Sequence, residues 1–341
     1  MAQTVTTINE LMFVSELSRL TFRTNNPDCT FAIVRNGQEV FKQSYVADSN
    51  NLVTIYDLDR LLDTLIADIY DSFTFLVSGT ALGRSNVKVF KCNAAVAEPA
   101  KTFIPDFFLT ASMGERDTTP ERYEVVTLYT DTETPVQAIC TYVGDDLTVA
   151  TVNENITSLL GWSYIDVSPS RFMKPEKGTL VAYTIQAGKR KAHFRVHPSL
   201  PEAEPAVMFR NCFHAWETLY LTGAMETSGS YTRSSPIVGG QFRIYDIEET
   251  LSYKAQTGPL RPGAVPVAMD LARSKEVFLL NADGTVGDEI AITAVENKRT
   301  NEDNHMPDFS FTYRRVDRRN TMIAVERPPR IFDKTFDETY E

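Results

Sequence analysis

The spacing of the histidines comes nearest to a metal site in this sequence. His193 and His197 are four residues apart, which on a helix would place two ligands on one face. The apolar residues around them alternate, however, and this pattern predicts a strand, where residues four apart lie about 13 Å from each other. One metal ion cannot bind both. Cys212 and His214 would complete a site only if the chain folds back suitably, so we expect no structural metal and no cofactor.

The same predicted strand has a basic outer face, which we call the basic stripe. Its residues are Lys189, Lys191, His193, Arg195 and His197. In an acidic protein such a stripe is a candidate site for a carboxylate, a phosphate or an acidic patch on a partner. The plainer interpretation is a solvated strand face, or an edge that its charge protects against aggregation. We predict the basic stripe and two aromatic residues, Trp162 and Trp216, as candidate partner-binding residues.

Motifs for covalent or nucleotide chemistry are incomplete. "GWSYI" at 161–165 has the first glycine and the serine of G-x-S-x-G, but Ile165 stands where the second glycine should be. Neither phosphate-binding glycine pattern occurs, and "NADGTVGDE" at 281–289 fails the spacing of a calcium loop. Paired carboxylates of the glycosidase kind stay open, since 45 acidic residues allow many pairs.

Charge and composition limit the partners. The chain has 341 residues, and 34 basic against 45 acidic side chains give a net charge of -11, which disfavours nucleic acid as a partner. The four cysteines contain no C-x-x-C pair and are expected to be small buried hydrophobes. We find no signal peptide and no apolar run long enough to span a membrane. We therefore expect a protein made in the cytoplasm.

Strand and hairpin patterns dominate the rest of the sequence. Asn36-Gly37 and Asp283-Gly284 each stand between two β-prone runs, which predicts hairpin turns. In "DFSFTYRRV" the aromatic residues Phe309, Phe311 and Tyr313 alternate with polar ones, which is typical of a half-buried antiparallel strand. The sequence therefore predicts a mainly β protein built of antiparallel β-sandwiches.

One segment predicts a helix instead. From Leu58 to Phe73 apolar residues recur at spacings of three and four, after Asp57 as a plausible N-cap. We expect one amphipathic helix near residues 58–73 in the first domain. Two segments, 50–62 and 239–251, also share a turn pair followed by a short stretch ending in Ile-Tyr-Asp. We interpret them as return strands of hairpins, and duplication stays an open alternative.

Proline-marked polar stretches suggest where domains end. They lie at 113–122 and 197–206, with a long internal loop at 256–266. We predict a β-rich domain with one helix at 1–117, a β-sandwich-like domain at 118–203, and a second one with a long internal loop at 204–341.

A resemblance to known proteins rests on three stretches. They are the "N-x-F-x-x-x-E" pattern of Asn211, Phe213 and Glu217, the "YKAQTG" turn at 253–258, and the strand at 310–314. Together they resemble uncharacterised, tail-associated β-rich structural proteins encoded by prophages of gut bacteria. The resemblance brings no catalytic residues and implies a role in a virion or tail assembly.

These observations predict a non-enzymatic structural or assembly protein of a phage tail or virion. It would act by protein–protein contacts in a homo- or hetero-oligomer, and would be located in the virion after assembly. One alternative is a glycan-binding adhesin or receptor-binding protein, in which exposed aromatic rings such as Trp162, Trp216 or Tyr231 stack on sugars of the cell surface. A second alternative is a carboxylate-dependent hydrolase.

Overall fold

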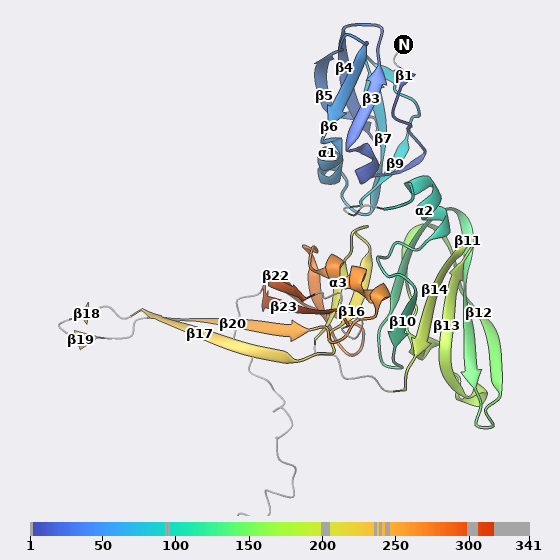
Figure 1. Cartoon of the computed structure of the whole chain (residues 1–341), viewed down its shortest axis with the longest axis vertical. Coiled ribbons are helices and arrows are strands. Elements are labelled where there is room, and N and C mark those ends of the chain that lie inside the picture. Colours follow the sequence, from blue (N-terminus) through green and yellow to red (C-terminus); the bar gives the residue numbers. More distant parts are fainter. Residues whose placement is uncertain are drawn as a thin grey trace, which may run out of the picture.

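The computed structural model describes residues 3–92, 94, 96–198, 205–234, 237–238, 241–242, 246–298 and 306–316. It is a mainly β, multidomain structure of antiparallel and mixed sheets, which confirms the predicted fold class (Figure 1). Within the described residues there are three short α-helices. None of them is long and apolar enough to cross a membrane.

Two sheets form a sandwich at the N-terminal end. The smaller has the order β1-β3-β6, with β1 Gln3–Thr4, β3 Arg19–Arg23 and β6 Leu52–Tyr56. The larger has the order β2-β9-β7-β4-β5, with β8 beside β7. Its strands are β2 Leu11–Phe13, β4 Asp28–Arg35, β5 Gln38–Val46, β7 Tyr70–Val77, β8 Thr80–Ala81 and β9 Val87–Phe90. Between β2 and β3 lies a 3₁₀ helix, η1 Val14–Leu17, and after β6 comes α1 Leu58–Leu65.

Alternating apolar residues of both sheets bury the core of this sandwich. Phe22 of β3 lies over Phe31 of β4 with ring centroids 6.3 Å apart, and Phe31 stacks on Phe75 of β7 at 6.2 Å. Leu58 and Leu62 of α1 are buried in the same cluster. The helix therefore closes one side of the β core.

The predicted helix is too long. It begins at Leu58 as expected but ends at Leu65, because Ile66 is extended, and residues 70–77 form β7. The buried residues Phe73, Phe75 and Val77 alternate along β7, and this pairing with β4 and β9 outweighs the local helical spacing. Asp57 does precede the helix, but its side chain makes no capping hydrogen bond.

The predicted turns differ in outcome. Asn36 and Gly37 both have positive φ and join Arg35 to its partner Gln38, as a tight hairpin requires. At the second turn only Gly284 has positive φ, and the loop spans 281–285. The interpretation of 50–56 as the return strand of a hairpin is wrong, because β6 pairs with β3. The same interpretation of 239–251 is confirmed, because residues 241–242 and 246–251 pair antiparallel with the strand residues that precede Gly239, although residues 239–240 and 243–245 lie outside the described residues.

The second unit, after the N-terminal sandwich as the first unit, is a five-stranded sheet of order β10-β14-β13-β11-β12. Its strands are β10 Glu115–Thr118, β11 Val125–Val143, β12 Val149–Asp166, β13 Thr179–Ala187 and β14 Arg190–Val196. Two 3₁₀ helices, η2 Pro169–Arg171 and η3 Pro175–Lys177, connect β12 to β13. β10 is parallel to β14 and the other pairs are antiparallel. The register of β11 shifts against β12 between Thr130 and Thr134 and between Val136 and Gln137, and against β13 between Thr141 and Tyr142.

The third unit is a seven-stranded sheet of order β16-β15-β21-β22-β23-β20-β17. Its strands are β15 Ala206–Arg210, β16 Trp216–Tyr220, β17 Met225–Ser234, β20 Asp246–Gln256, β21 Val277–Leu280, β22 Val286–Lys298 and β23 Asp308–Arg315. β18 Ile237–Val238 pairs with β19 Gln241–Phe242, and η4 Pro262–Ala264 leads into α3 Val265–Leu271. The predicted strand at 309–313 is confirmed, with Phe309, Phe311 and Tyr313 buried.

A separate apolar cluster joins the three units. The helix α2 Ala100–Asp106 lies between the first and second units (Figure 1). Its Phe103 contacts both Phe13 of β2 and Phe213, with centroid distances of 5.7 and 5.2 Å. Tyr129 of β11 packs edge-on against Phe90 of β9 at 4.9 Å. Residues from all three units therefore share one core at the junction.

Candidate functional site: a polar junction and the exposed strands

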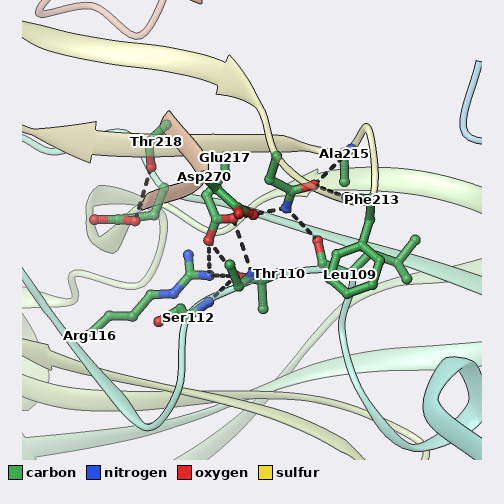
Figure 2. Close-up of polar contacts among 12 residues, drawn as sticks. Leu109, Thr110, Ser112, Arg116, Phe213, Ala215, Glu217, Thr218 and Asp270 are labelled. Carbon is green, nitrogen blue, oxygen red and sulfur yellow. Dashed lines mark hydrogen bonds and ion pairs between the residues drawn. The ribbon is translucent and has the colours of Figure 1, made fainter. Parts of the chain in front are cut away.

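A buried carboxylate, Glu217 of β16, organises the contact between the second and third units. Arg116 of β10 donates a hydrogen bond of 2.9 Å to Oε1 of Glu217, and Thr110 donates to the same oxygen (Figure 2). Oε2 accepts from the side-chain amide of Asn211 at 2.8 Å and from the backbone of Ala111 at 3.4 Å. Both oxygens are thus occupied by protein donors.

Asn211 extends this network into the loop between β15 and β16. Its amide nitrogen also donates to the Leu109 carbonyl at 2.9 Å. Its side-chain oxygen accepts from the backbone nitrogens of Phe213 and Ala215, each at 3.0 Å (Figure 2). These bonds fix the loop and thereby hold Phe213 in the junction core. Every polar group of the amide has a partner, as burial requires.

The linker between α2 and β10 approaches the third unit closely. The backbone nitrogen of Met113 donates to the carbonyl of Gly263 at 3.0 Å. A Cβ atom at Gly263 would lie 1.7 Å from the Met113 carbonyl oxygen, so only glycine fits at this position. The close backbone contact adds to the Glu217 network in joining the two units.

A cavity of about 300 Å³ lies beside this network. Arg116, Arg122, Glu124 and Glu217 are among its lining residues. Burial raises the pKa of Glu124 and outweighs the opposite effects of Arg116, Arg122, Thr118 and Thr218. The cavity is therefore lined by one carboxylate whose oxygens are hydrogen-bonded and by one carboxyl group whose pKa is raised by burial.

Acidic residues of β10 meet much of the basic stripe. Arg195 pairs with Glu115 at 3.2 Å, and His197 with Asp117 at 2.7 Å. Arg261 of the third unit pairs with the same Asp117 at 2.7 Å. The C-terminal half of the stripe is consequently part of an ion-pair network that connects the second and third units.

The rest of the stripe is more open. Lys189 pairs with Asp106 at 3.2 Å, and His193 shares a hydrogen bond of 2.9 Å with Thr184. Lys191 is exposed on the same strand face. Arg190, beside the stripe, points inward and donates to the carbonyls of Ile104 and Tyr129. A role of the stripe in partner binding stays a prediction, with several of its charges already paired inside the chain.

The two tryptophans flank the junction. Trp162 of β12 is partly buried against the junction core. Trp216 begins β16, lies under the guanidinium of Arg210 at 3.8 Å and meets Phe278 edge-on at 5.9 Å. Both rings have intramolecular partners, and their contribution to partner binding also stays a prediction.

The cysteines, and the histidines that the structure describes, form no cluster of metal ligands. Cys29, Cys92 and Cys140 are buried free thiols and Cys212 is partly buried, as the sequence predicts. The side chains of Cys92 and Cys212 interact, which lowers the pKa of Cys92 and raises that of Cys212. Within the part of the chain that the structure describes, no group of three or more His, Cys, Asp or Glu residues is placed to hold a metal ion.

Sequence analysis predicted the return strand of the hairpin formed by β17 and β20, which we call the ribbon, but it did not predict β17 or the projection of this hairpin from its sheet. The ribbon projects from the third unit away from the other two (Figure 1). Only Tyr253–Gln256 of β20 pair with β23, so over the described residues 246–252 the partner of β20 is β17 alone. The alternation of Tyr231 and Arg233 with serines and threonines was the available signal.

The residues that carry the sequence resemblance lie at structural positions. Glu217 and Asn211 form the junction network, and Tyr253 stacks on Tyr313 with centroids 5.2 Å apart. Thr257 accepts a hydrogen bond of 3.0 Å from the backbone of Phe309. The residues that carry the resemblance therefore make packing and hydrogen-bond contacts within the third unit and at the junction.

Comparisons with known proteins give structural neighbours only. No family model matches the chain, and no curated protein matches it. One similar solved structure is a chain of the virion of a native gene transfer agent particle, at 12% identity and a TM-score of 0.23, covering 32% of this chain and 91% of that chain. Another is a chain of the six-fold symmetrised baseplate of the anti-feeding prophage, at 13% identity and a TM-score of 0.21, covering 36% of this chain and 93% of that chain. TM-scores of this size do not establish a common fold, so no residue role is transferred.

Proposed function

We propose that this protein is a non-enzymatic structural subunit of a phage tail or related virion assembly and acts through protein–protein contacts. The ribbon carries the proposal. An isolated two-stranded arm is at best marginally stable in water, and a partner surface stabilises it. Tyr231 and Ile247 near its far end are 58% and 51% exposed, as expected of side chains that a partner covers in the assembled state.

The junction supports a subunit that holds its contact surfaces at fixed positions. Glu217 receives hydrogen bonds from the linker and from β10, and Phe213 packs against residues of the first unit. The three units thus share one apolar core, and the buried polar network of Glu217 joins the second unit to the third. The sequence resemblance to tail-associated prophage proteins favours a tail or virion as the assembly.

The second candidate function is a glycan-binding adhesin, which Tyr231 favours because its ring is exposed and aromatic rings stack on sugars. A glycan array with the parent protein and Tyr231→Ala would detect this activity. A hydrolase gains less support, because the oxygens of Glu217 are already hydrogen-bonded to Thr110, Arg116 and Asn211.

The test is the composition of particles from cells that carry the gene. We expect the chain in density-purified particles at a fixed ratio to the other subunits, as measured by quantitative mass spectrometry. The double variant Tyr231→Ser, Ile247→Ser should be lost from the particles, whereas the matched control Thr232→Ser, on the opposite face of the ribbon, should be retained. Complete particles that contain none of the chain would refute the proposal.

A further inference from the structure

The ribbon has two chemically different faces. Residues opposite each other in an antiparallel pair point to the same side. One face consequently carries Met225 with Ala255, Thr227 with Tyr253, Gly229 with Leu251, Tyr231 with Glu249, and Arg233 with Ile247. The other carries Glu226 with Lys254, Ser228 with Ser252, Ser230 with Thr250, and Thr232 with Glu248. The ribbon is amphipathic along its described length.

The apolar face continues the core of the third unit. At the base of the ribbon Met225 and Tyr253 pack against that core. Farther out, the Tyr231 ring lies over Gly229 and beside Leu251, since a Cβ at Gly229 would meet these two side chains at 3.3 and 3.4 Å. An apolar face that runs outward from a core indicates that further structure covers it in the assembled state.

The backbone of the ribbon also has an edge with which no other strand among the described residues pairs. β17 is the last strand of the seven-stranded sheet, and β20 is its partner. The six central residues of β17, 227–232, are uncharged and lie between Glu226 and Arg233. Natural proteins usually protect a long edge with Lys, Pro or a bulge, so an edge without them is suited to pairing with another strand.

A second long edge lies in the five-stranded sheet, where residues 149–155 of β12 pair with β11 in unbroken register before a register shift at Ile156. β12 is its last strand and pairs with β11. Between Val149 and Ile165 its one charged residue is Glu154, which pairs with Lys174 at 2.6 Å. The side chains of Val152, Ile156 and Leu159 pack on the core side. Asn153 and Asn155 lie exposed on the other side, and Thr157, beyond the register shift, is also exposed.

The two edges match in their alternation. On one face lie the uncharged polar side chains Ser228, Ser230 and Thr232 of β17 and Thr151, Asn153 and Asn155 of β12, whereas Tyr231 of β17 and Val152 of β12 point to the other face. Of the other edges among the described residues, β5 carries the Glu39–Lys42 ion pair, the outer side of β20 over 246–252 carries three acidic residues, and the remaining edge strands have at most five residues. Copies with a net charge of -11 repel each other, and this repulsion is weakest where charges are fewest.

We propose that the outer edge of β17 in one copy adds to the free edge of β12 in a second copy of this chain. Figure 1 places the ribbon and β12 at opposite sides of the molecule, so the two edges of one chain do not meet. The contact is heterologous, and its repetition produces a ring or a filament. In the joined sheet the apolar face of the ribbon continues the core side of β12. This inference rests on the proposed function and names the partner of the ribbon.

Disulfide cross-linking between two variants tests this pairing. One chain carries Ser230→Cys on the ribbon and the other Asn155→Cys on β12; both positions are exposed. The mixture is oxidised with copper phenanthroline, and cross-linked dimers are identified by non-reducing gel and mass spectrometry. The parent protein measures the background from the native cysteines. Ser44→Cys on the exposed β5 edge replaces Asn155→Cys in the matched control.

We expect the ribbon–β12 mixture to give a dimer yield about tenfold above the control mixture. The two edges alone do not fix which residue of β17 lies opposite which residue of β12. Each single-cysteine variant of β17 is therefore mixed with each single-cysteine variant of β12. The substituted positions are Ser228, Ser230 and Thr232 on β17, and Asn153, Asn155 and Thr157 on β12. Equal yields with Ser44→Cys, cross-linking of Ser230→Cys with itself in preference to β12, or no dimer in any combination would each overturn the inference. If the chain is present in particles and no combination cross-links, the proposed function stands and the ribbon binds a different subunit.

Discussion

Replacing Glu217 with Gln should destabilise the junction by about 3–5 kcal/mol, the usual cost of removing one partner of a buried ion pair. The side chains of Glu217 and Arg116 are 2% and 13% exposed, so Arg116 would keep its charge with little water to compensate it. The new amide nitrogen would also face hydrogen-bond donors in either orientation. At the Oε1 position these donors are Arg116 and Thr110, and at the Oε2 position they are Asn211 and Ala111. Each such unmatched donor adds about 1–3 kcal/mol at most.

Urea unfolding followed by tryptophan fluorescence suits this measurement, because the two tryptophans of the chain, Trp162 and Trp216, flank the junction. Glu226→Gln, at an exposed position of the ribbon, is the matched control and should change the free energy of unfolding by less than about 0.5 kcal/mol. Arg116→Met combined with Glu217→Gln should recover about 1–3 kcal/mol relative to the sum of the single variants. A loss below about 1 kcal/mol for Glu217→Gln, with additive double-variant behaviour, would refute this reasoning.

Three further predictions concern other parts of the chain. Leu62→Ala should cost about 2–5 kcal/mol in the free energy of unfolding, since Leu62 is fully buried in the first core, and a loss below about 0.5 kcal/mol would show the helix to be peripheral. Burial raises the pKa of Glu124 in the folded protein above its value in the unfolded chain. Its contribution to folding stability is therefore complete at pH values below the unfolded pKa and is lost as the pH rises through the folded pKa. Glu124→Gln should therefore become more stable than the parent as the pH rises from the unfolded to the folded pKa of Glu124, and the two should be equally stable at low pH. A difference in the free energy of unfolding that is the same at all pH values would contradict this. Replacing Lys189, Lys191 and Arg195 together by Ser should change melting little, because exposed ion pairs contribute about 0–1 kcal/mol each, and should weaken assembly and its salt dependence if the basic stripe binds an acidic neighbour. Assembly like that of the parent at every ionic strength would make the stripe a solvated face.

Local patterns were sufficient for several elements. Asn36-Gly37 supplied both positive φ angles of its turn, and the alternation of Phe309, Phe311 and Tyr313 predicted the buried face of β23. The same kind of reasoning extended the helix too far. Ile66, Ile69 and Phe73 fit a helical spacing, yet Phe73 belongs to a strand whose alternation continues beyond the helical pattern. Short apolar runs support both periodicities, and the neighbouring strands decide between them.

The candidate site was less accessible to such reasoning. Nothing near Glu217 in the sequence distinguishes it from the other acidic residues, and its partner Arg116 lies 101 positions away. The resemblance pattern did include Glu217 and Asn211, but it carried no information about what they contact. The basic stripe was visible as a strand face, whereas the acidic residues that pair with it come from β10, a parallel neighbour that follows no local pattern.

The sequence by itself determined the β character of this protein, its acidic charge and the side to which each strand's side chains point, because these depend on composition and on a two-residue period. Only the tertiary structure decided which strands became neighbours, which carboxylate was buried against an arginine, and which pair of strands extended beyond its core as a ribbon. Those outcomes depend on apolar residues far apart in the chain packing into common cores, and the cores in turn determine which polar groups lose water and which edges remain open.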